Sequence, residues 1–299
     1  MQVVAIFGPT GVGKTGVAVA LSERLRERGE DPLAISADAL QVYRGLEVLT
    51  GAASPQERAA LEHRLVGFLA VSETFSAGEF ARRAREEVDR ALAAGRRPIL
   101  VGGTGLYLQA ALTDLELRPP PPSELRERLE GELQALGPEA LHARLAESDP
   151  EAAERIEPRD GARVVRALEL LEMGEEPARG GEASALWTAS LRHPTLLCGL
   201  TMERAALYAR IDARVEEMLA RGATEEVRRA EAAGASRTAG AALGYAELLR
   251  GDVEGMKRRS RNYARRQLTW MRRLRGVQLI DVTGREPGDV AREIEALLT

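Results

Sequence analysis

Short hydrophobic runs alternate with longer segments of helical periodicity over the first hundred residues. Residues 3–7, 32–36 and 97–101 predict buried strands, because apolar side chains occupy most positions in each run. The helical segments before the second and third runs end at Gly29 and Gly95. Strands that alternate with helices in this way predict a parallel sheet with helices on both faces.

The alternation stops at four consecutive prolines, residues 119–122. Helical segments then follow one another without a strand between them, over residues 123–136, 139–145 and 163–173. Gly180 and Gly181 predict a loop, and the sheet resumes over 194–200. We therefore predict an α/β core formed by 1–115 and 195–299, with an all-helical insertion over 116–194. Helices over 203–220, 252–275 and 289–298 and a strand over 277–282 complete the predicted core.

A glycine-rich loop follows the first strand directly. Residues 8–15 fit the pattern G-x-x-x-x-G-K-[ST], with a strand before them and a helix after, which predicts a P-loop NTPase-like fold. Backbone N–H groups of such a loop point at phosphate oxygens, and the lysine adds a positive charge. The predicted diphosphate-binding residues are Gly8, Thr10, Gly11, Val12, Gly13, Lys14 and Thr15. The hydroxyl of Thr15 is the predicted Mg²⁺ ligand.

Composition excludes several other classes of protein. The 299 residues, 44% hydrophobic and 29% charged, are typical of a soluble globular protein with ample length for a core. Cys198 is the only cysteine, and with three histidines it leaves neither a disulfide framework nor a plausible zinc cluster. A strand already begins near Met1, so we expect no signal peptide, and no apolar stretch approaches the roughly 18 residues of a membrane span. We expect a cytoplasmic monomer.

The charge is unevenly distributed, although the net value of −4 by itself argues against a nucleic-acid partner. Between Met256 and Gly276 there are nine basic residues and no acid, with Tyr263 and Trp270 among them. Arginine-rich segments with interleaved aromatic residues suit RNA phosphates and bases. The same segment is equally compatible with a solvated helix face, because this chain uses arginine heavily throughout.

Two further segments stand at the carboxyl ends of predicted strands, where α/β proteins bind ligands. Asp38 follows the second strand and can hold Mg²⁺, accept a proton or merely cap the next helix. After the third strand, Gly102, Gly103, Thr104 and Gly105 stand where many P-loop enzymes carry a Mg²⁺-binding acid. The glycines allow close approach to a ligand or serve a tight turn. The missing acid weakens a nucleotide-hydrolase interpretation.

These segments together resemble the tRNA dimethylallyltransferase family, also called tRNA isopentenyltransferases. The resemblance rests on the 8–15 loop, Asp38 with residues 41–45, residues 101–107 and residues 265–270, and it extends over almost the whole chain. It implies transfer of a dimethylallyl group from dimethylallyl diphosphate to the N6 amine of the adenosine at tRNA position 37, with Mg²⁺ as cofactor. It also implies that the helical insertion binds the anticodon stem-loop.

The resemblance further implies roles for individual residues. Asp38 accepts the proton of the attacking amine, Thr104 contacts the adenosine, and Lys14 stabilises the departing diphosphate. The implied tRNA contacts are Asp38, Ala39, Leu40, Gln41, Thr104, Arg126, Ala162, Arg163, Val164, Val165, Arg166, Arg265, Arg266, Gln267, Thr269, Trp270 and Arg272, together with residues 241–246. We add Arg228 as a candidate diphosphate contact, although a helix-surface arginine is its plainer interpretation.

The chain departs from the usual family pattern at three places. Ala39 stands where serine often follows the catalytic aspartate, residues 49–53 lack the usual lysine, and the arginine expected near Gly244 and Tyr245 is absent. None of these departures affects Lys14, Thr15, Asp38 or Thr104.

Three other functions fit parts of the sequence. A small-molecule P-loop kinase would use the same loop on ATP and would need no RNA contact. An adenylate isopentenyltransferase would act on free AMP and would need neither the basic segment nor the insertion. An RNA-binding, ATPase-like switch is disfavoured by the missing acid after Val101.

Overall fold

The computed structural model describes residues 1–115, 117–175 and 190–298. The chain divides into two compact units, one formed by Met1–Asp114 with Ser190–Thr299 and the other by Leu115–Ala189. We call them the core and the insertion, and the sequence had placed the insertion over 116–194. The loop predicted at Gly180 and Gly181 lies outside the described residues.

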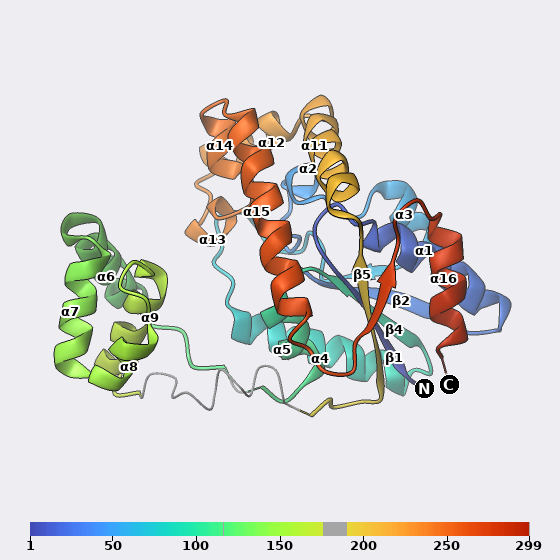
Figure 1. The fold of residues 1–299 in the computed structure, drawn as a ribbon, viewed down its shortest axis with the longest axis horizontal. Coiled ribbons are helices and arrows are strands. Elements are labelled where there is room, and N and C mark those ends of the chain that lie inside the picture. Colours follow the sequence, from blue (N-terminus) through green and yellow to red (C-terminus); the bar gives the residue numbers. More distant parts are fainter. Residues whose placement is uncertain (116, 176–189, 299) are drawn as a thin grey trace. The chain divides into compact units, whose positions relative to one another are not determined.

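The core contains a six-stranded parallel sheet with the strand order β3-β2-β4-β1-β5-β6 (Figure 1). The strands are β1 Val3–Phe7, β2 Pro32–Ala37, β3 His63–Arg64, β4 Arg97–Gly102, β5 Thr195–Thr201 and β6 Gln278–Asp281. Every residue of β1 and β2 is buried, as expected for strands covered on both faces. Phe7 pairs with Gly102 on one side and Gly199 on the other, so these strands end close to one level.

Helices cover both faces of this sheet. On one face, Val4 and Ile6 of β1 share a hydrophobic cluster with α1 (Lys14–Glu27) and α16 (Pro287–Ala296). On the other, α4 (Ala77–Ala93) packs against α5 (Gly105–Leu112). The predicted α/β, P-loop-like architecture is confirmed.

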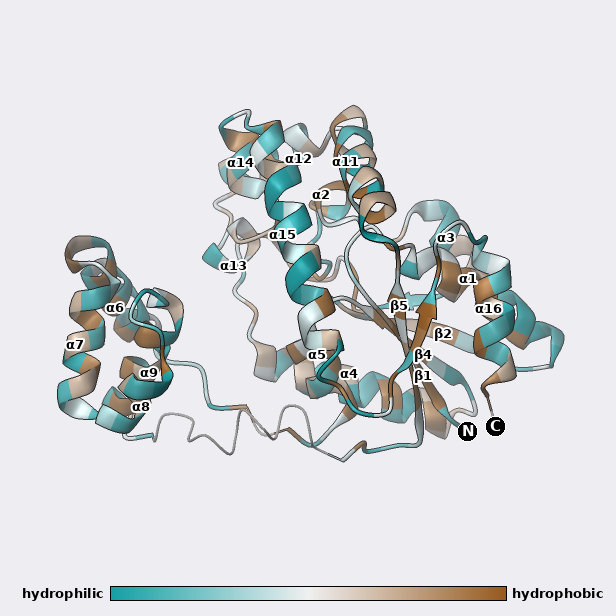
Figure 2. Cartoon of the chain, in the orientation of Figure 1, coloured by the Kyte–Doolittle hydropathy of each residue, from teal (hydrophilic) through white to brown (hydrophobic). Residues whose placement is uncertain are grey.

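The remaining core helices gather beyond the carboxyl ends of the strands (Figure 1). They are α2 Glu47–Thr50, α3 Pro55–Ala60, α11 Arg204–Ala220, α12 Ala223–Ala232, α13 Arg237–Gly240, α14 Tyr245–Leu249 and α15 Val253–Met271. Figure 2 shows the contrast between the hydrophobic strands and the largely hydrophilic α15. The sequence predicted α11 and α15 but not α12, α13 or α14. The helix predicted for α15 ends at residue 275, four residues beyond the observed end at Met271.

The insertion is helical throughout its regular structure. Its helices are α6 Ser123–Leu136, α7 Pro138–Ser148, α8 Pro150–Arg155 and α9 Gly161–Glu172. Leu129, Leu141, Leu145 and Val164 are at its centre and are almost fully buried, so the unit has a small core of its own. The sequence did not predict α8, whose six residues are too few for a clear helical repeat.

No helix in the described part of the chain is both long and apolar enough to cross a membrane.

Candidate active site

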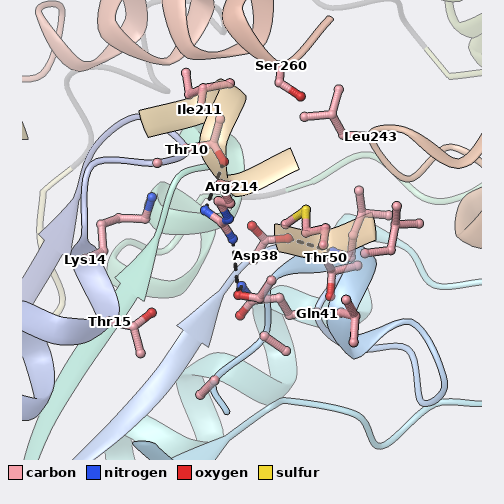
Figure 3. Close-up of a pocket in the computed structure, with 18 of the residues that line it drawn as sticks. Thr10, Lys14, Thr15, Asp38, Gln41, Thr50, Ile211, Arg214, Leu243 and Ser260 are labelled. Atoms are coloured by element: carbon pink, nitrogen blue, oxygen red, sulfur yellow. Dashed lines mark hydrogen bonds between the residues drawn. The ribbon is translucent and has the colours of Figure 1, made fainter. Parts of the chain in front are cut away.

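A cavity of about 1250 Å³ lies at the carboxyl ends of the strands (Figure 3). Its walls come from the 8–15 loop, the segment after β2, residues 48–57, α11 and α15. The predicted residues Thr10, Lys14, Thr15, Asp38 and Gln41 all line it. One concave site therefore collects most of the chemistry that the sequence singled out.

The loop at residues 8–15 has the backbone of an anion site. Gly13 adopts φ 99°, a left-handed conformation that favours glycine, and α1 begins at the next residue. A side chain at Gly8 would lie 2.6 Å from the carbonyl oxygen of Leu200, so the first glycine is required by packing against β5. Gly11, Gly13, Lys14 and Thr15 line the cavity, so the amino end of α1 lies at it and favours negative charge there.

Lys14 is turned back onto this loop. Its ammonium donates hydrogen bonds of 3.0 Å to the carbonyl oxygens of Gly8 and Pro9. Burial and, to a smaller extent, the positive charge of Arg214 lower the pKa of Lys14 from 10.5 to about 7, while the charge of Asp38 opposes both. A diphosphate would supply the negative charge that the Lys14 ammonium lacks here.

Asp38 is the negative centre of the site. Its carboxylate accepts a 2.9 Å hydrogen bond from the backbone N–H of Leu40, which fixes the turn after β2. Its charge raises the pKa of Lys14, Tyr107 and Tyr263, although burial is the largest influence on all three. The carboxylate is half-buried and faces the cavity, so it can reach a bound amine.

Gln41 ties the turn after β2 to a second wall of the cavity. Its side chain accepts a hydrogen bond from the Ser36 hydroxyl and donates one to the carbonyl oxygen of Gly51. Arg214 donates to the same Gly51 oxygen, at 3.4 Å. Residues 49–53, which lack the usual lysine, therefore receive a cation from α11.

Thr104 does not line the cavity itself but contacts a residue that does. Its hydroxyl lies 3.2 Å from the phenol oxygen of Tyr263 on α15. Burial raises the pKa of Tyr263 to about 12, so the phenol is neutral at physiological pH. Tyr263 can therefore orient the Thr104 hydroxyl without adding charge to the site.

The glycines around Thr104 make room for side chains of α15. A Cβ at Gly103 would collide with the amide nitrogen of Gln267, and a Cβ at Gly105 would lie 2.6 Å from the Trp270 ring. Trp270 also stacks on Phe7, with ring centroids 5.6 Å apart. At these two glycines, the space predicted for a ligand is therefore occupied by side chains of the protein itself.

Three cavity arginines, Arg210, Arg214 and Arg221, were missed by the sequence analysis. Arg210 and Arg214 are four residues apart on α11 and line the cavity, and Figure 3 shows Arg214 between Thr10 and Asp38. Arg214 donates to the Thr10 hydroxyl at 3.3 Å, and a Cβ at Gly13 would lie 3.3 Å from the Arg210 guanidinium. Their spacing on one helix face was a signal, but an arginine-rich chain offers many such pairs. Arg228 is exposed on α12 and does not line the cavity.

The predicted tRNA contacts occupy several different environments. Arg265, Arg266 and Thr269 are exposed on α15, and Arg272 is exposed directly after its end. Arg266 lies over the Tyr263 ring and lines the cavity. Gln267 is buried and its amide is hydrogen-bonded within the protein. Of residues 241–246, Ala241 and Leu243 line the cavity, whereas Ala242 and Tyr245 are buried. Ala39 and Leu40 are half-buried in the turn after β2.

The insertion holds the remaining predicted contacts. Glu169 is fully buried and accepts two hydrogen bonds from Arg126 and one from Arg166, over 2.7–3.0 Å. Ala162 and Arg163 are exposed at the start of α9, but Val164 and Val165 are buried and face the core of the unit. The two valines therefore pack in the core of the insertion, whereas Arg126, Arg163 and Arg166 are at least partly exposed at the surface of the unit.

The cavity suits a metal ion that shares its ligands with a substrate. No group of three or more His, Cys, Asp or Glu side chains that could hold a metal occurs among the described residues. The Thr15 hydroxyl and the Asp38 carboxylate both line the cavity. Mg²⁺ is typically bound by one or two such protein oxygens together with substrate phosphates, so the residues fit this ion.

Comparison with known proteins identifies relatives over the whole chain. The family model described as IPP transferase matches residues 41–274. A tRNA dimethylallyltransferase from Kineococcus radiotolerans is 44% identical, over 100% of this chain and 96% of its own length. One from Thermobifida fusca is 43% identical, over 91% and 87%.

Solved structures give the same result. A tRNA isopentenylpyrophosphate transferase from Bacillus halodurans has a TM-score of 0.70 and 34% identity, with 99% of this chain and 95% of that chain covered. A eukaryotic dimethylallyltransferase acting on tRNA has a TM-score of 0.73 and 27% identity, with 94% and 74% covered. The resemblance drawn from the sequence motifs is therefore confirmed.

Proposed function

The chain belongs to the IPP transferase family, and from this premise we propose that it transfers a dimethylallyl group from dimethylallyl diphosphate to the N6 amine of tRNA adenosine 37. The observation that carries the proposal is the meeting of a phosphate-binding loop with Asp38 and the Tyr263–Thr104 pair around one cavity. The cavity therefore offers binding groups to both the donor diphosphate and the acceptor amine.

The donor diphosphate is bound by cations from two elements. Loop amides and Lys14 approach it from the amino end of α1, and Arg210 and Arg214 approach from α11. Negative charge on the diphosphate grows as it leaves, so fixed positive groups stabilise the transition state more than the bound donor. Arg228 is not part of this set, because it lies outside the cavity.

The transfer itself needs one base. The N6 nitrogen forms a bond to the first carbon of the dimethylallyl group while the bond from that carbon to the diphosphate oxygen breaks. The diphosphate keeps the electron pair of the broken bond, and Asp38 accepts the proton of the amine. Thr104, oriented by Tyr263, holds the adenosine in line with the donor.

Thr15 is the residue that would hold Mg²⁺ together with donor phosphate oxygens, which leaves the Asp38 carboxylate available to accept the proton. When bound, the ion adds positive charge beside the departing diphosphate.

The tRNA is contacted by two parts of the chain. The exposed arginines of α15 bind its phosphates. The insertion binds the anticodon stem-loop through Arg163 and through Arg126 and Arg166, which are hydrogen-bonded to Glu169. The target adenosine leaves its stack to reach the cavity, because an amine inside a stacked loop is out of reach.

The rival functions fit the structure less well. A kinase requires an acid that binds Mg²⁺ for γ-phosphoryl transfer, and β4 ends instead in a glycine loop filled by Gln267 and Trp270. An enzyme acting on free AMP has no use for the exposed arginines of α15 or for a separate helical unit.

The decisive experiment offers labelled dimethylallyl diphosphate and Mg²⁺ with tRNA, with AMP or with no acceptor. We expect label in tRNA only, and in the N6-dimethylallyl adenosine released from it by nuclease digestion. Label in AMP alone would show that the acceptor is a free nucleotide. Phosphate transfer from ATP to a small molecule, without alkylation of RNA, would establish the kinase instead.

A further inference from the structure

One buried side chain joins the two loops that the proposed function assigns to donor and acceptor. Gln267 is 3% exposed. Its amide oxygen accepts a hydrogen bond of 2.8 Å from the backbone N–H of Thr10, and its amide nitrogen donates one of 2.8 Å to the carbonyl oxygen of Gly103. The loops after β1 and β4 are therefore bridged by a single planar amide.

The two loops pack closely around this amide. A Cβ at Gly103 would meet the amide nitrogen of Gln267 on one side and the Gly8 carbonyl oxygen, 3.1 Å away, on the other. Thr10 is held from a second direction, because its hydroxyl accepts a hydrogen bond from Arg214. The bridge is thus fixed at both of its ends.

Neighbouring residues on α15 reinforce the same relationship. Tyr263 and Trp270 lie four residues before and three residues after Gln267, so the three side chains share one face of the helix. Tyr263 contacts Thr104, and Trp270 stacks on Phe7. Arg265, a predicted RNA contact, is exposed on the same helix. Helix α15 therefore carries predicted RNA contacts and also spans both loops.

We propose that Gln267 is a positioning residue for the transfer reaction, which sets the distance between the donor-binding loop and Thr104. The inference rests on the proposed function, in which the 8–15 loop holds the diphosphate and Thr104 contacts the adenosine. Each loop binds its own substrate through other groups, so loosening the bridge separates two bound substrates without releasing either. Such a loss lowers kcat, because transfer depends on the alignment of the reacting atoms.

A direct contact between Gln267 and tRNA makes the opposite kinetic prediction. Removal of a side chain that binds RNA raises KM for tRNA and leaves kcat near its normal value. The burial of Gln267 and the use of both ends of its amide inside the protein favour the positioning role.

The test is Gln267→Met, a substitution of similar length that removes both hydrogen bonds. We expect kcat to fall about 100-fold, the loss associated with a misplacement of about 1 Å, with both KM values within about threefold of the original. Gln278→Met is the matched control, because Gln278 is an exposed glutamine on β6 of the same unit. A Gln267→Met enzyme with kcat within twofold of the original, or with only the tRNA KM raised, overturns the proposal.

A second measurement does not depend on activity. Hydrogen exchange followed by NMR should be slow at the Thr10 amide of the original protein and much faster in Gln267→Met, with little change at amides of α16. Unchanged exchange at Thr10 overturns the bridge even if the transfer reaction proves correct. Conversely, an original protein that alkylates no RNA refutes the proposed function while this exchange test stands.

A third variant covers the case in which Gln267→Met does not fold. Gln267→Asn keeps the amide but is one methylene shorter, so it cannot reach both partners. It should show the same fall in kcat with unchanged KM values, and a fully active Gln267→Asn enzyme contradicts the inference.

Discussion

The Arg214 guanidinium donates a 3.3 Å hydrogen bond to the hydroxyl of Thr10, a residue 204 positions earlier in the chain. The contact brings a cation from α11 onto the phosphate-binding loop. Ile211, three residues before Arg214, lies against Gly11 of the same loop, where a Cβ would be 2.9 Å away. Helix α11 therefore packs against this loop, a contact that the loop motif alone does not predict.

Arg214→Ala should impair use of the donor. We expect kcat/KM for dimethylallyl diphosphate to fall by about 100-fold, because a fixed cation beside developing negative charge is lost. Steady-state kinetics at saturating tRNA measure this change. Arg228→Ala is the matched control, since that arginine is exposed on α12 and outside the cavity. Equal losses in the two variants would show that general charge, and not the position of Arg214, matters.

Asp38→Asn should abolish most turnover while the site stays intact. Asparagine keeps an oxygen for the Leu40 N–H, so the turn after β2 persists, but it no longer accepts a proton. We expect kcat to fall by about 100- to 10,000-fold, with affinity for tRNA changed less than about threefold. Single-turnover transfer and tRNA binding by filter retention separate the two effects. A variant with unimpaired single-turnover transfer would remove Asp38 from the chemistry.

Lys14 should reduce the stability of the substrate-free protein at acid and neutral pH. Burial lowers its pKa in the folded state from 10.5 to about 7, so the unfolded chain holds this proton more tightly. The resulting destabilisation is complete below pH 7 and is relieved as the pH rises toward 10.5. Lys14→Met should therefore raise the Tm more at about pH 6 than at about pH 9.5, as measured by calorimetry.

Lys257, the only other lysine, provides a control of opposite sign. Hydrogen bonds to Glu216 and Glu254 raise the pKa of Lys257 above its ordinary value. Its small stabilising contribution is therefore present at both test pH values and is lost only above about pH 10.5. Lys257→Met should lower the Tm slightly and equally at both. A pH-independent effect of Lys14→Met would contradict the predicted titration.

Replacement of Arg265 and Arg266 by alanine should weaken tRNA binding and flatten its salt dependence. Both side chains are exposed on α15. Two lost phosphate contacts should reduce the slope of log K against log salt by about 1.5 to 2 units. The double replacement of Arg82 and Arg90, exposed arginines of α4, is the control. An unchanged slope would identify the basic segment as a solvated helix face.

Glu169→Gln should destabilise the insertion. Burial of the Glu169 carboxylate opposes ionisation, but hydrogen bonds from Arg126 and Arg166 overcome it and hold the pKa below its ordinary value. The stabilisation is therefore present above about pH 4.5 and is lost as the pH falls through the lowered value. We expect faster hydrogen exchange in α6 and α9 at neutral pH.

Glu172→Gln is the matched control for this prediction. Glu172 also lies between two arginines of the insertion, Arg128 and Arg144, but its side chain is 30% exposed. Solvent weakens such pairs, so the substitution should change exchange little. A larger effect at Glu172 than at Glu169 would show that burial does not decide the strength of these contacts.

Local sequence signals predicted the parts of the fold that have strong periodicity. The buried runs of β1, β2 and β4 and the helix α6 were visible because each repeats its own pattern of apolar residues. Helices α13 and α14 were not, since they have only four and five residues, and no bounds were predicted for α12, which packs against α11 and α14. The two-residue β3 carries too few positions for any pattern.

The site shows the same division. Lys14, Thr15 and Asp38 stand beside strands that end at the cavity, so their chain positions predicted their place. Arg214 reaches it from a distant helix, where an arginine has no local signature, and the basic segment pointed to Tyr263 only as an RNA contact and not as a partner of Thr104. Gln267 was singled out by the family resemblance as a tRNA contact, but its burial against two loops follows only from the packing of α15.

The depressed pKa of Lys14 also gives this protein an unusual chemical handle. A chain with 42 basic side chains has only two lysines, and the second is protonated and ion-paired with Glu216 and Glu254. Near neutral pH a large share of Lys14 is the free amine, which is a nucleophile. Apart from the amino terminus, Lys14 is therefore the amine of this chain whose charge changes near neutral pH, and its protonation responds to a phosphate that occupies the loop.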